Sequence, residues 1–101
     1  MKKVNQRIVS NFNLFQNYPN PFNPSTRIRW QSPIGCWQTL KVYDILGNEV
    51  ATLINEYKPA GNYEIEFNGH SDDGRNLPSG VYFYQLRAGD FVQTKKMILL
   101  Q

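Results

Sequence analysis

Hydrophobic and polar residues alternate with a period of two in several short runs, which is the pattern of β-strands with one buried face. The clearest run is residues 62–67, where Tyr63, Ile65 and Phe67 share one face and two glutamates share the other. The same alternation in the other runs predicts a core between two sheets. Its members are Ile28, Trp30, Leu40, Val42, Tyr63, Ile65, Phe67, Tyr82, Tyr84 and Leu86.

The end of the chain predicts a long β-hairpin. Residues 79–88 and 91–100 are rich in β-prone side chains and flank Gly89 and Asp90. Tight hairpin turns require positive φ, which Gly and Asp tolerate. We therefore expect positive φ at one of these two residues, and by the same reasoning at Gly47 or Asn48. The first of the two runs is apolar on both faces in its upper half, which indicates a strand at the centre of its sheet.

The remaining runs predict an all-β fold. Strands are expected over residues 27–31, 39–43 and 49–54, and a short strand at residues 75–77 would complete the set. Apolar positions in 49–54 do not alternate, which favours a bulge or a twisted edge. No window keeps the period of a helix. Six to seven antiparallel strands spaced about 10 to 12 residues apart are typical of an immunoglobulin-like β-sandwich.

We divide the chain into three parts. Residues 1–13 show no periodicity and are interpreted as a linker or tag remnant. Residues 14–26, here called the Pro/Asn segment, are expected to form a lead-in to the sandwich. Residues 27–101 are expected to form the sandwich itself, and a chain of this length has room for one such domain.

The prolines of the Pro/Asn segment exclude a helix or a central strand in that segment. Pro19, Pro21 and Pro24 lack N–H donors and fix φ. The prediction is a stiff, polyproline-like stretch that leaves Tyr18 and Phe22 free to anchor on a surface. Such a stretch is either a rigid linker or a ligand for an aromatic groove of a partner.

Composition excludes several classes of partner. Eleven basic and eight acidic residues give a net charge of +3, and the basic residues are scattered. Nucleic-acid binding needs a basic stripe, so none is expected. No apolar run approaches the about 20 residues that span a bilayer, so no membrane insertion is expected. No apolar stretch follows Lys2 and Lys3, so no export signal is expected within the chain. The chain is then either cytosolic or the tail of a longer exported protein.

The residues that usually carry catalysis are scarce. His70 is the only histidine and Cys36 the only cysteine, too few for a zinc site or a nucleophile-base pair. Because Cys36 is the only cysteine, the chain cannot form the internal disulfide that true immunoglobulin domains have. Residues 68–74 lack the acidic spacing of a calcium loop. We expect no enzyme activity, no catalytic or metal-binding residues and no cofactor, and no role for Cys36 in catalysis or metal binding.

Four blocks of the sequence, in order, resemble the type A C-terminal sorting domains of the type IX (Por) secretion system. The blocks are QNYPNPFNPST (16–26), VYDILGNEV (42–50), the landmarks Ala60-Gly61, Phe67-Asn68-Gly69 and Gly74, and SGVYFYQL (79–86) with TKKMILL (94–100). The chain departs from the family pattern at Ser32, Cys36 and Gln38. These departures leave open the register of the second predicted strand, residues 39–43.

The resemblance implies a FlgD-like immunoglobulin sandwich at the C-terminus of a secreted cargo protein. The implied partners are the type IX translocon, a sortase-like peptidase and an upstream cargo domain. In many members the peptidase removes the domain and the cargo is attached to lipopolysaccharide. The implied location is the cell surface or the medium, reached through the periplasm.

Four consecutive apolar residues at the end of the chain have two interpretations. They are either a last strand docked on the core or an element read by a partner. The second interpretation, a hypothesis based on the resemblance, assigns translocon recognition to Gly80, Tyr82, Tyr84, Lys95, Lys96, Met97, Ile98, Leu99 and Leu100. A free apolar edge strand would suit strand addition by a partner.

The alternative function is an immunoglobulin-like binding or scaffold module. A carbohydrate site needs exposed aromatic rings with nearby amide or acidic groups, and Trp37, Tyr43 and Asn48 could supply them. A sorting signal is expected to require Leu100 and Gln101 at the true end of the protein, whereas a binding module would tolerate an extension.

Overall fold

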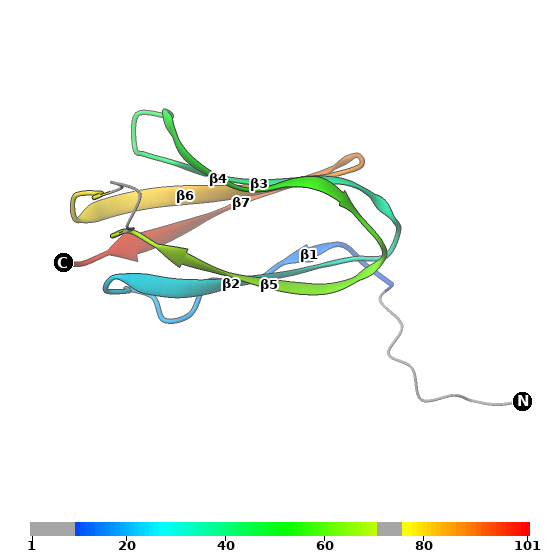
Figure 1. Cartoon of the computed structure of the whole chain (residues 1–101), viewed down its shortest axis with the longest axis horizontal. Helices are drawn as coiled ribbons and strands as arrows, with labels where there is room; N and C mark the ends of the chain where they lie inside the picture. The colour runs from blue at the N-terminus through cyan, green and yellow to red at the C-terminus, as the bar shows by residue number, and fades with distance from the viewer. Residues whose placement is uncertain (1–9, 71–75) are drawn as a thin grey trace, which may run out of the picture.

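The computed structural model describes residues 10–70 and 76–101 as two packed antiparallel sheets (Figure 1). One sheet has the strand order β1-β2-β5 and the other the order β4-β3-β6-β7. The strands are β1 (Asn13–Leu14), β2 (Ser25–Ser32), β3 (Cys36–Tyr43), β4 (Glu49–Lys58), β5 (Gly61–Asn68), β6 (Gly80–Ala88) and β7 (Phe91–Leu99). The predicted all-β, antiparallel sandwich is confirmed.

Strand β6 lies at the centre of the four-stranded sheet, as its two apolar faces predicted. It pairs with β3 on one side and with β7 on the other. Strand β4 lies at the opposite edge from β7 and pairs with β3 through two register shifts. Because of these shifts Val50 and Leu53 have no direct partner on β3. The irregular apolar pattern of β4 therefore reflects bulges in an edge strand.

Two glycines provide the predicted left-handed turn positions. Gly47 has φ of 88° in the β3–β4 turn, and Gly89 has φ of 59° in the β6–β7 turn. The first turn is also held by the Asp44 carboxylate, which accepts the backbone N–H groups of Leu46 and Asn48 at 2.9 Å each. These bonds, led by the one from Asn48, lower the pKa of Asp44. The β3–β4 tip is thus a rigid turn.

The core contains all the predicted residues except Tyr63 and Ile65, which are only partly buried. Both lie on β5, an edge strand of the three-stranded sheet, so one side of each is left open. The alternation pattern identified their inward face but not this edge position. The core also contains residues that the pattern did not single out, namely Leu14, Phe22, Ala51, Ala88, Met97 and Leu99.

The three departures from the family pattern lie together around Trp30. Gln38 is fully buried, and its Oε1 accepts the Trp30 indole N–H at 2.9 Å. The Gln38 amide nitrogen lies 3.9 Å from the Cys36 sulfur, which in turn lies 3.9 Å from Ser32 Oγ. Gln38, Leu40 and Val42 all face inward, so the register of β3 is settled. A polar side chain is tolerated there because it pairs with a buried indole.

The Pro/Asn segment is part of the sandwich, and the expectation of a free polyproline-like lead-in is wrong. Leu14 pairs with Trp30 in β1, and Phe22 is only 2% exposed, whereas Tyr18 is 79% exposed. The peptide bonds that precede its three prolines are cis. Strand β2 already begins at Ser25.

The expected strand at residues 75–77 begins outside the described residues. Its described part contributes an isolated bridge between His70 and Asn76. The strand that completes the three-stranded sheet is β1, which lies at the start of the Pro/Asn segment. Sequence reasoning passed over β1 because it has only two residues.

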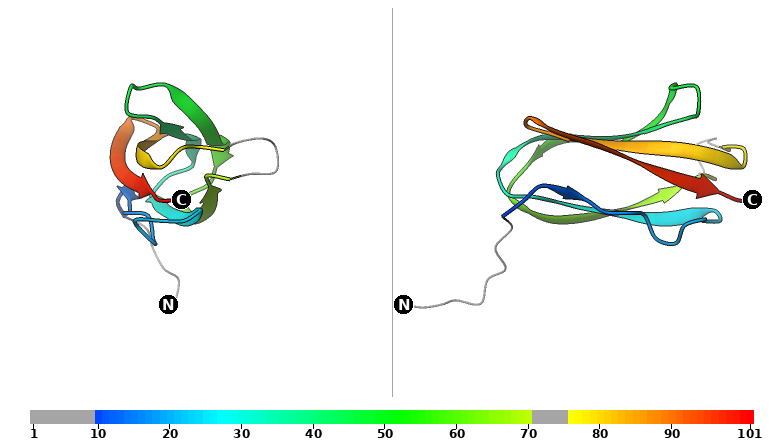
Figure 2. Two further views of the ribbon diagram at one scale, coloured as in Figure 1. Left: turned by 90° about the vertical axis from the view of Figure 1, so that its left-hand side faces the viewer. Right: turned by 180° about the vertical axis from the view of Figure 1, so that it is seen from behind.

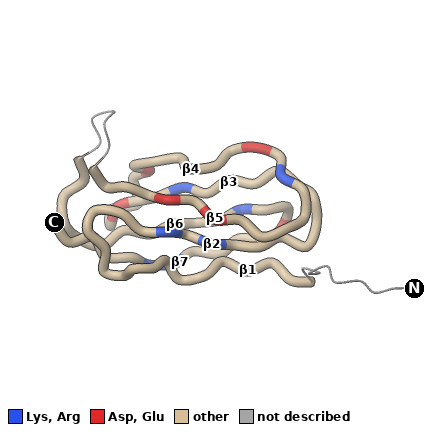
Figure 3. The backbone as a smooth tube through the Cα atoms, turned by 60° about the horizontal axis from the view of Figure 1, so that its bottom comes forward, with Lys and Arg blue, Asp and Glu red and all other residues tan. Residues whose placement is uncertain are grey.

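The outer face of the three-stranded sheet carries opposite charges on adjacent strands (Figure 3). Arg27 and Arg29 of β2 are the Cα partners of Glu66 and Glu64 of β5. Arg27 also forms a diagonal ion pair with Glu64 at 2.5 Å. Exposed pairs of this kind contribute less than about 1 kcal/mol each, so the charges on this face add little to stability.

Candidate functional site

The outer edge of the terminal strand β7 is covered by the Pro/Asn segment. The two run along each other where the sandwich is seen from behind (Figure 2). The Phe22 N–H donates to the Ile98 carbonyl oxygen, and the Leu100 N–H donates to the Phe22 carbonyl oxygen, each at 2.9 Å. Phe22 and Leu99 thereby form a parallel bridge. The Phe22 ring packs edge-on against Phe67 of β5, with centroids 6.1 Å apart.

Three amide side chains extend this contact along β7. The Ile98 N–H donates to Asn20 Oδ1 at 3.0 Å, and Gln16 Nε2 donates to the Lys96 carbonyl oxygen at 2.8 Å. Nearer the β6–β7 turn, Gln93 Oε1 accepts the Leu14 N–H at 3.3 Å. The expectation that the last strand offers a free edge for strand addition is therefore wrong at positions 96, 98 and 100.

Asn17 and Tyr84 hold the Pro/Asn segment from the inside. The buried Tyr84 hydroxyl donates to the Phe15 carbonyl oxygen and accepts the Asn17 N–H, both at 2.7 Å. The Asn17 side chain donates to Thr26 Oγ1 and to the Pro19 carbonyl oxygen. Burial raises the pKa of Tyr84 to about 12, against the lowering effect of the Asn17 bond. The hydroxyl stays protonated and supplies both bonds over the whole physiological range.

The structure divides the predicted recognition residues into two sets. Tyr82, Tyr84, Met97 and Leu99 are buried in the core. Burial also raises the pKa of Tyr82, whose hydroxyl donates to the Pro78 carbonyl oxygen at 2.6 Å. Both tyrosine hydroxyls have the polar partners that buried phenols need. These four side chains stabilise the hairpin and do not present a surface to a partner.

The second set is accessible and lies around the end of β7. Lys96 is exposed on the outer face, and Ile98 lies on the same face. Leu100 follows the strand and is 52% exposed. Lys95 is half-buried because it shares the inward-facing row with Met97 and Leu99. Gly80, at the start of β6, is the Cα partner of Leu99.

Sequence reasoning missed the residues that join the two ends of the domain. These are Gln16, Asn17, Asn20 and Phe22. A signal was present, because amide side chains alternate with prolines there and can bond to backbone groups that proline leaves unpaired. The partner strand is about 80 residues away, so no local pattern identifies it.

The residues of the expected carbohydrate site do not form one group. Trp37 and Tyr43 lie at opposite ends of β3. The Asn48 side chain lies in the β3–β4 turn, where its amide donates to the Asp44 carboxylate. Trp37 instead pairs across the sheet with Tyr57 of β4.

The described part of the chain shows no cluster of three or more His, Cys, Asp or Glu side chains that could hold a metal ion. His70 is exposed and pairs with Asn76 by a bridge. Most of the loop compared with a calcium site lies outside the described residues. Within residues 10–70 and 76–101 there is no helix with the length and apolar character needed to cross a membrane.

The solved structures that share this fold include two from the same bacterium. One is PorZ, described as an essential surface component of the type IX secretion system of Porphyromonas gingivalis, with 18% identity and a TM-score of 0.61 over 87% of the chain. The other is dimeric latent PorU from the same bacterium, with 19% identity and a TM-score of 0.66 over 91% of the chain. The chain spans only 11% and 10% of those proteins, respectively.

No curated protein sequence matches the chain. A family model described as "Secretion system C-terminal sorting domain" matches residues 16–100. The match begins within the Pro/Asn segment and ends one residue after β7, the strand that this segment covers. The chain therefore belongs to the family of secretion system C-terminal sorting domains.

Proposed function

We propose that this domain is the sorting signal that directs an upstream cargo protein through the type IX translocon across the outer membrane. Family membership supports the sorting role. The fold shared with PorZ, a surface component of that system, supports the choice of machine. The destination of the cargo is the cell surface or the medium, by way of the periplasm.

The observation that carries this proposal is the joining of the two ends of the family match at one edge. The bonds of Phe22 and Asn20 to Ile98 and Leu100 fix the terminal strand in a single position. The described chain begins at one pole of the sandwich and β7 ends at the other (Figure 1). The translocon would then meet a folded, rigid edge.

Recognition falls on the outward-facing members of the predicted set. Lys96 supplies a charge, and Ile98 near the end of β7 and Leu100 just beyond it supply apolar contact area. Lys95 and Gly80 lie at the margins of this surface. The buried members, such as Met97 and Leu99, act by holding the strand in place. A charged rim beside apolar contacts favours a specific, orientated encounter.

A reporter fusion tests the proposal. The whole chain is fused behind a periplasm-directed reporter in a bacterium that has the type IX machine. The intact fusion should reach the surface or the medium. The Leu100→Asp fusion should stay in the periplasm, as should the Lys96→Glu fusion.

Val92→Asp is the matched control, because Val92 is an apolar residue at the other end of β7 with a similar exposed fraction, 47% against 52% for Leu100. Its fusion should be exported normally. Export of a folded Leu100→Asp, Lys96→Glu double variant would contradict the proposed reading surface. Deletion of residues 95–101 is a poorer test, since it removes Met97 and Leu99 from the core.

We extend the proposal to the step after export, in which a sortase-like peptidase removes the domain from the cargo. Mass spectrometry of the exported reporter should show a product that lacks this domain. Recovery of only the full-length fusion at the surface would contradict removal while leaving the sorting role intact.

A further inference from the structure

An apolar pocket of about 380 Å³ lies between the β3–β4 turn and the segment that leads into β6. Figure 1 shows both elements at the pole of the sandwich where β7 ends. Val50, Leu77 and Tyr82 line the pocket and belong to the core or pack against it. The Tyr82 hydroxyl is already bonded to the Pro78 carbonyl oxygen, so the phenol adds no unpaired donor to the wall. The pocket therefore offers fixed apolar surface with room for a large side chain.

Two exposed apolar side chains lie at the rim of this pocket. Ile45 and Leu46 line it and have exposed fractions of 70% and 82%, although turn positions usually carry polar residues. The Asp44 carboxylate accepts the N–H groups of Leu46 and Asn48, so the backbone that presents the two side chains is fixed. Little conformational entropy is lost when a partner contacts a fixed turn. Neighbouring exposed apolar residues beside an apolar pocket are typical of an interaction site.

The pocket is continuous with the surface proposed for recognition at the end of β7. Val81 lines the pocket and is the Cα partner of Ile98. Ser79 also lines it, and its Oγ accepts the N–H of Gln101, the residue after Leu100, at 2.9 Å. A partner seated on the end of β7 therefore reaches the pocket without crossing another element.

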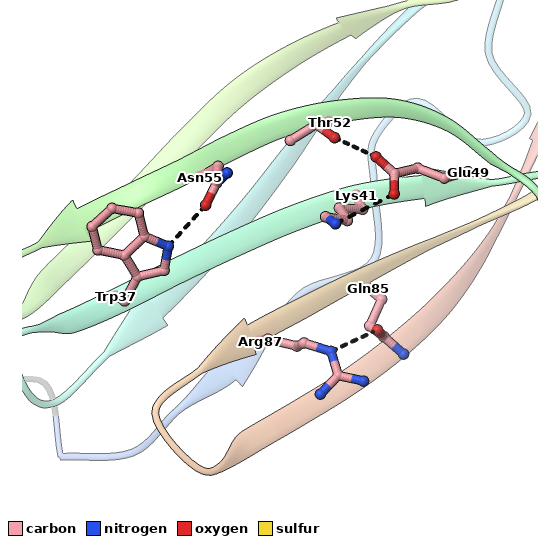
Figure 4. A network of polar contacts seen from close by, with 7 residues as sticks. All are labelled: Trp37, Lys41, Glu49, Thr52, Asn55, Gln85 and Arg87. Atoms are coloured by element: carbon pink, nitrogen blue, oxygen red, sulfur yellow. Dashed lines mark hydrogen bonds and ion pairs between the residues drawn. The ribbon is translucent and has the colours of Figure 1, made fainter.

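The remainder of the outer face of the four-stranded sheet is less suited to a partner, because its polar side chains are bonded to one another (Figure 4). The pairs are Lys41 with Glu49 at 3.3 Å, Trp37 with Asn55 at 2.8 Å and Arg87 with Gln85 at 3.2 Å. A partner that displaced these bonds would have to replace them. Within the described part of the chain no ion pair involves Lys96, so its charge is available to an acidic group of a partner.

We propose that the translocon inserts a large apolar side chain into this pocket and places an acidic group of the same segment beside Lys96. This inference rests on the proposed function and adds the β3–β4 turn to the surface that is read. Lys96 is the Cα partner of Phe83, two residues along β6 from Val81. Strand geometry then puts the Lys96 and Val81 Cα atoms about 8 Å apart, a span that one short segment covers. Burial of apolar surface supplies affinity, and the ion pair fixes orientation.

The reporter fusion described above tests the pocket with substitutions at its rim. The Ile45→Ser, Leu46→Ser double variant should lower the exported fraction about tenfold, since the loss of two apolar contacts at an interface has an effect of this order. Leu46→Met should be exported like wild type, because it keeps an apolar side chain of similar volume. Both positions are exposed, so thermal unfolding of each purified variant should match that of wild type.

Ile34→Ser is the matched control, because Ile34 is an exposed isoleucine, at 51%, in the β2–β3 turn at the opposite pole (Figure 1). Its fusion should be exported normally. The pocket proposal is overturned if the folded double variant is exported as well as wild type while Leu100→Asp is retained, a result that leaves the sorting role intact. An equal loss of export in Ile34→Ser also overturns it, because any loss of exposed apolar area would then have the same effect. A wild-type fusion that stays in the periplasm contradicts the sorting role itself, and the pocket proposal with it.

Discussion

Two amide residues, Asn17 and Gln38, are among the buried polar residues of this domain. Asn17 and Gln38 are both almost fully buried, and each pairs with an aromatic side chain that itself needs a partner. Asn17 meets the Tyr84 hydroxyl through its backbone N–H, and Gln38 meets the Trp30 indole. Such pairs contribute modestly when intact but are costly when half of the pair is removed. A single substitution that removes one partner should therefore cost more stability than the intact pair contributes.

Gln38→Leu should lower the free energy of unfolding by about 1–3 kcal/mol, because it leaves the Trp30 indole N–H buried without an acceptor. In a Trp30→Phe background the same substitution should cost less, since no donor is left unpaired. Urea denaturation of the four proteins gives the coupling energy. Equal costs in the two backgrounds would mean that the Trp30–Gln38 bond has no energetic role.

Stability should fall at alkaline pH partly through Tyr84. Its pKa is about 12 in the folded protein, whereas a free tyrosine ionises near pH 10. A pKa raised by folding contributes stability that is complete below about pH 10 and is lost as pH rises toward about 12. Tyr84→Phe should be less stable than wild type at neutral pH, because the Asn17 N–H loses its acceptor. The difference between the two proteins should shrink between pH 10 and 12. A constant difference across that range, measured by denaturation at each pH, would contradict this account.

At the scale of the elements, alternation was enough to predict most strands and their inward faces. Leu40, Val42 and Leu86 follow directly from a period of two, as do the Gly47 and Gly89 turns from their φ requirement. Two features were beyond local patterns. The partial exposure of Ile65 depends on which strand ends up at a sheet edge. The role of the Pro/Asn segment depends on a partner strand at the other end of the chain.

Asn20→Ala tests the contact between the Pro/Asn segment and β7. It removes the acceptor of the Ile98 N–H and should speed hydrogen exchange at that amide, with a global loss of about 1 kcal/mol or less. Asn23→Ala is the matched control, since Asn23 is an exposed amide in the same segment. Unchanged exchange at Ile98 in Asn20→Ala would show that the side-chain bond does not protect the edge.

At the scale of the whole molecule, the Pro/Asn segment closes one side of the sandwich and the other side is left with two edge strands. β4 and β5 each pair with a single neighbour, whereas β7 has both a neighbouring strand and the segment that covers it. Only this arrangement allows the predicted recognition residues to be divided into a buried set and an accessible set. Lys96 and Leu100 could not be separated from Met97 and Leu99 by composition, since a strand's two faces differ only once its register is fixed.

Removal of residues 1–24 should leave the remaining chain unable to fold stably. The truncation takes Leu14 and Phe22 out of the core, and losses of side chains of this size cost about 2–5 kcal/mol each. Such losses approach the whole stability of a small domain, about 5–15 kcal/mol. One-dimensional NMR and urea denaturation of residues 25–101 would measure the effect. A cooperative transition close to that of the full chain would restore the view of the segment as a dispensable lead-in.

The contact between Phe22 and Leu99 has a consequence for synthesis. A ribosome adds Phe22 long before Ile98 and Leu100, so the edge cannot close until residue 100 has been joined to the chain. A chain that ends before residue 98 leaves the Phe22 backbone N–H and carbonyl groups without their partners on β7 and its end. The closed domain therefore forms only after residue 100 has been synthesised, and a machine that accepts only the closed form would reject a chain truncated before that residue.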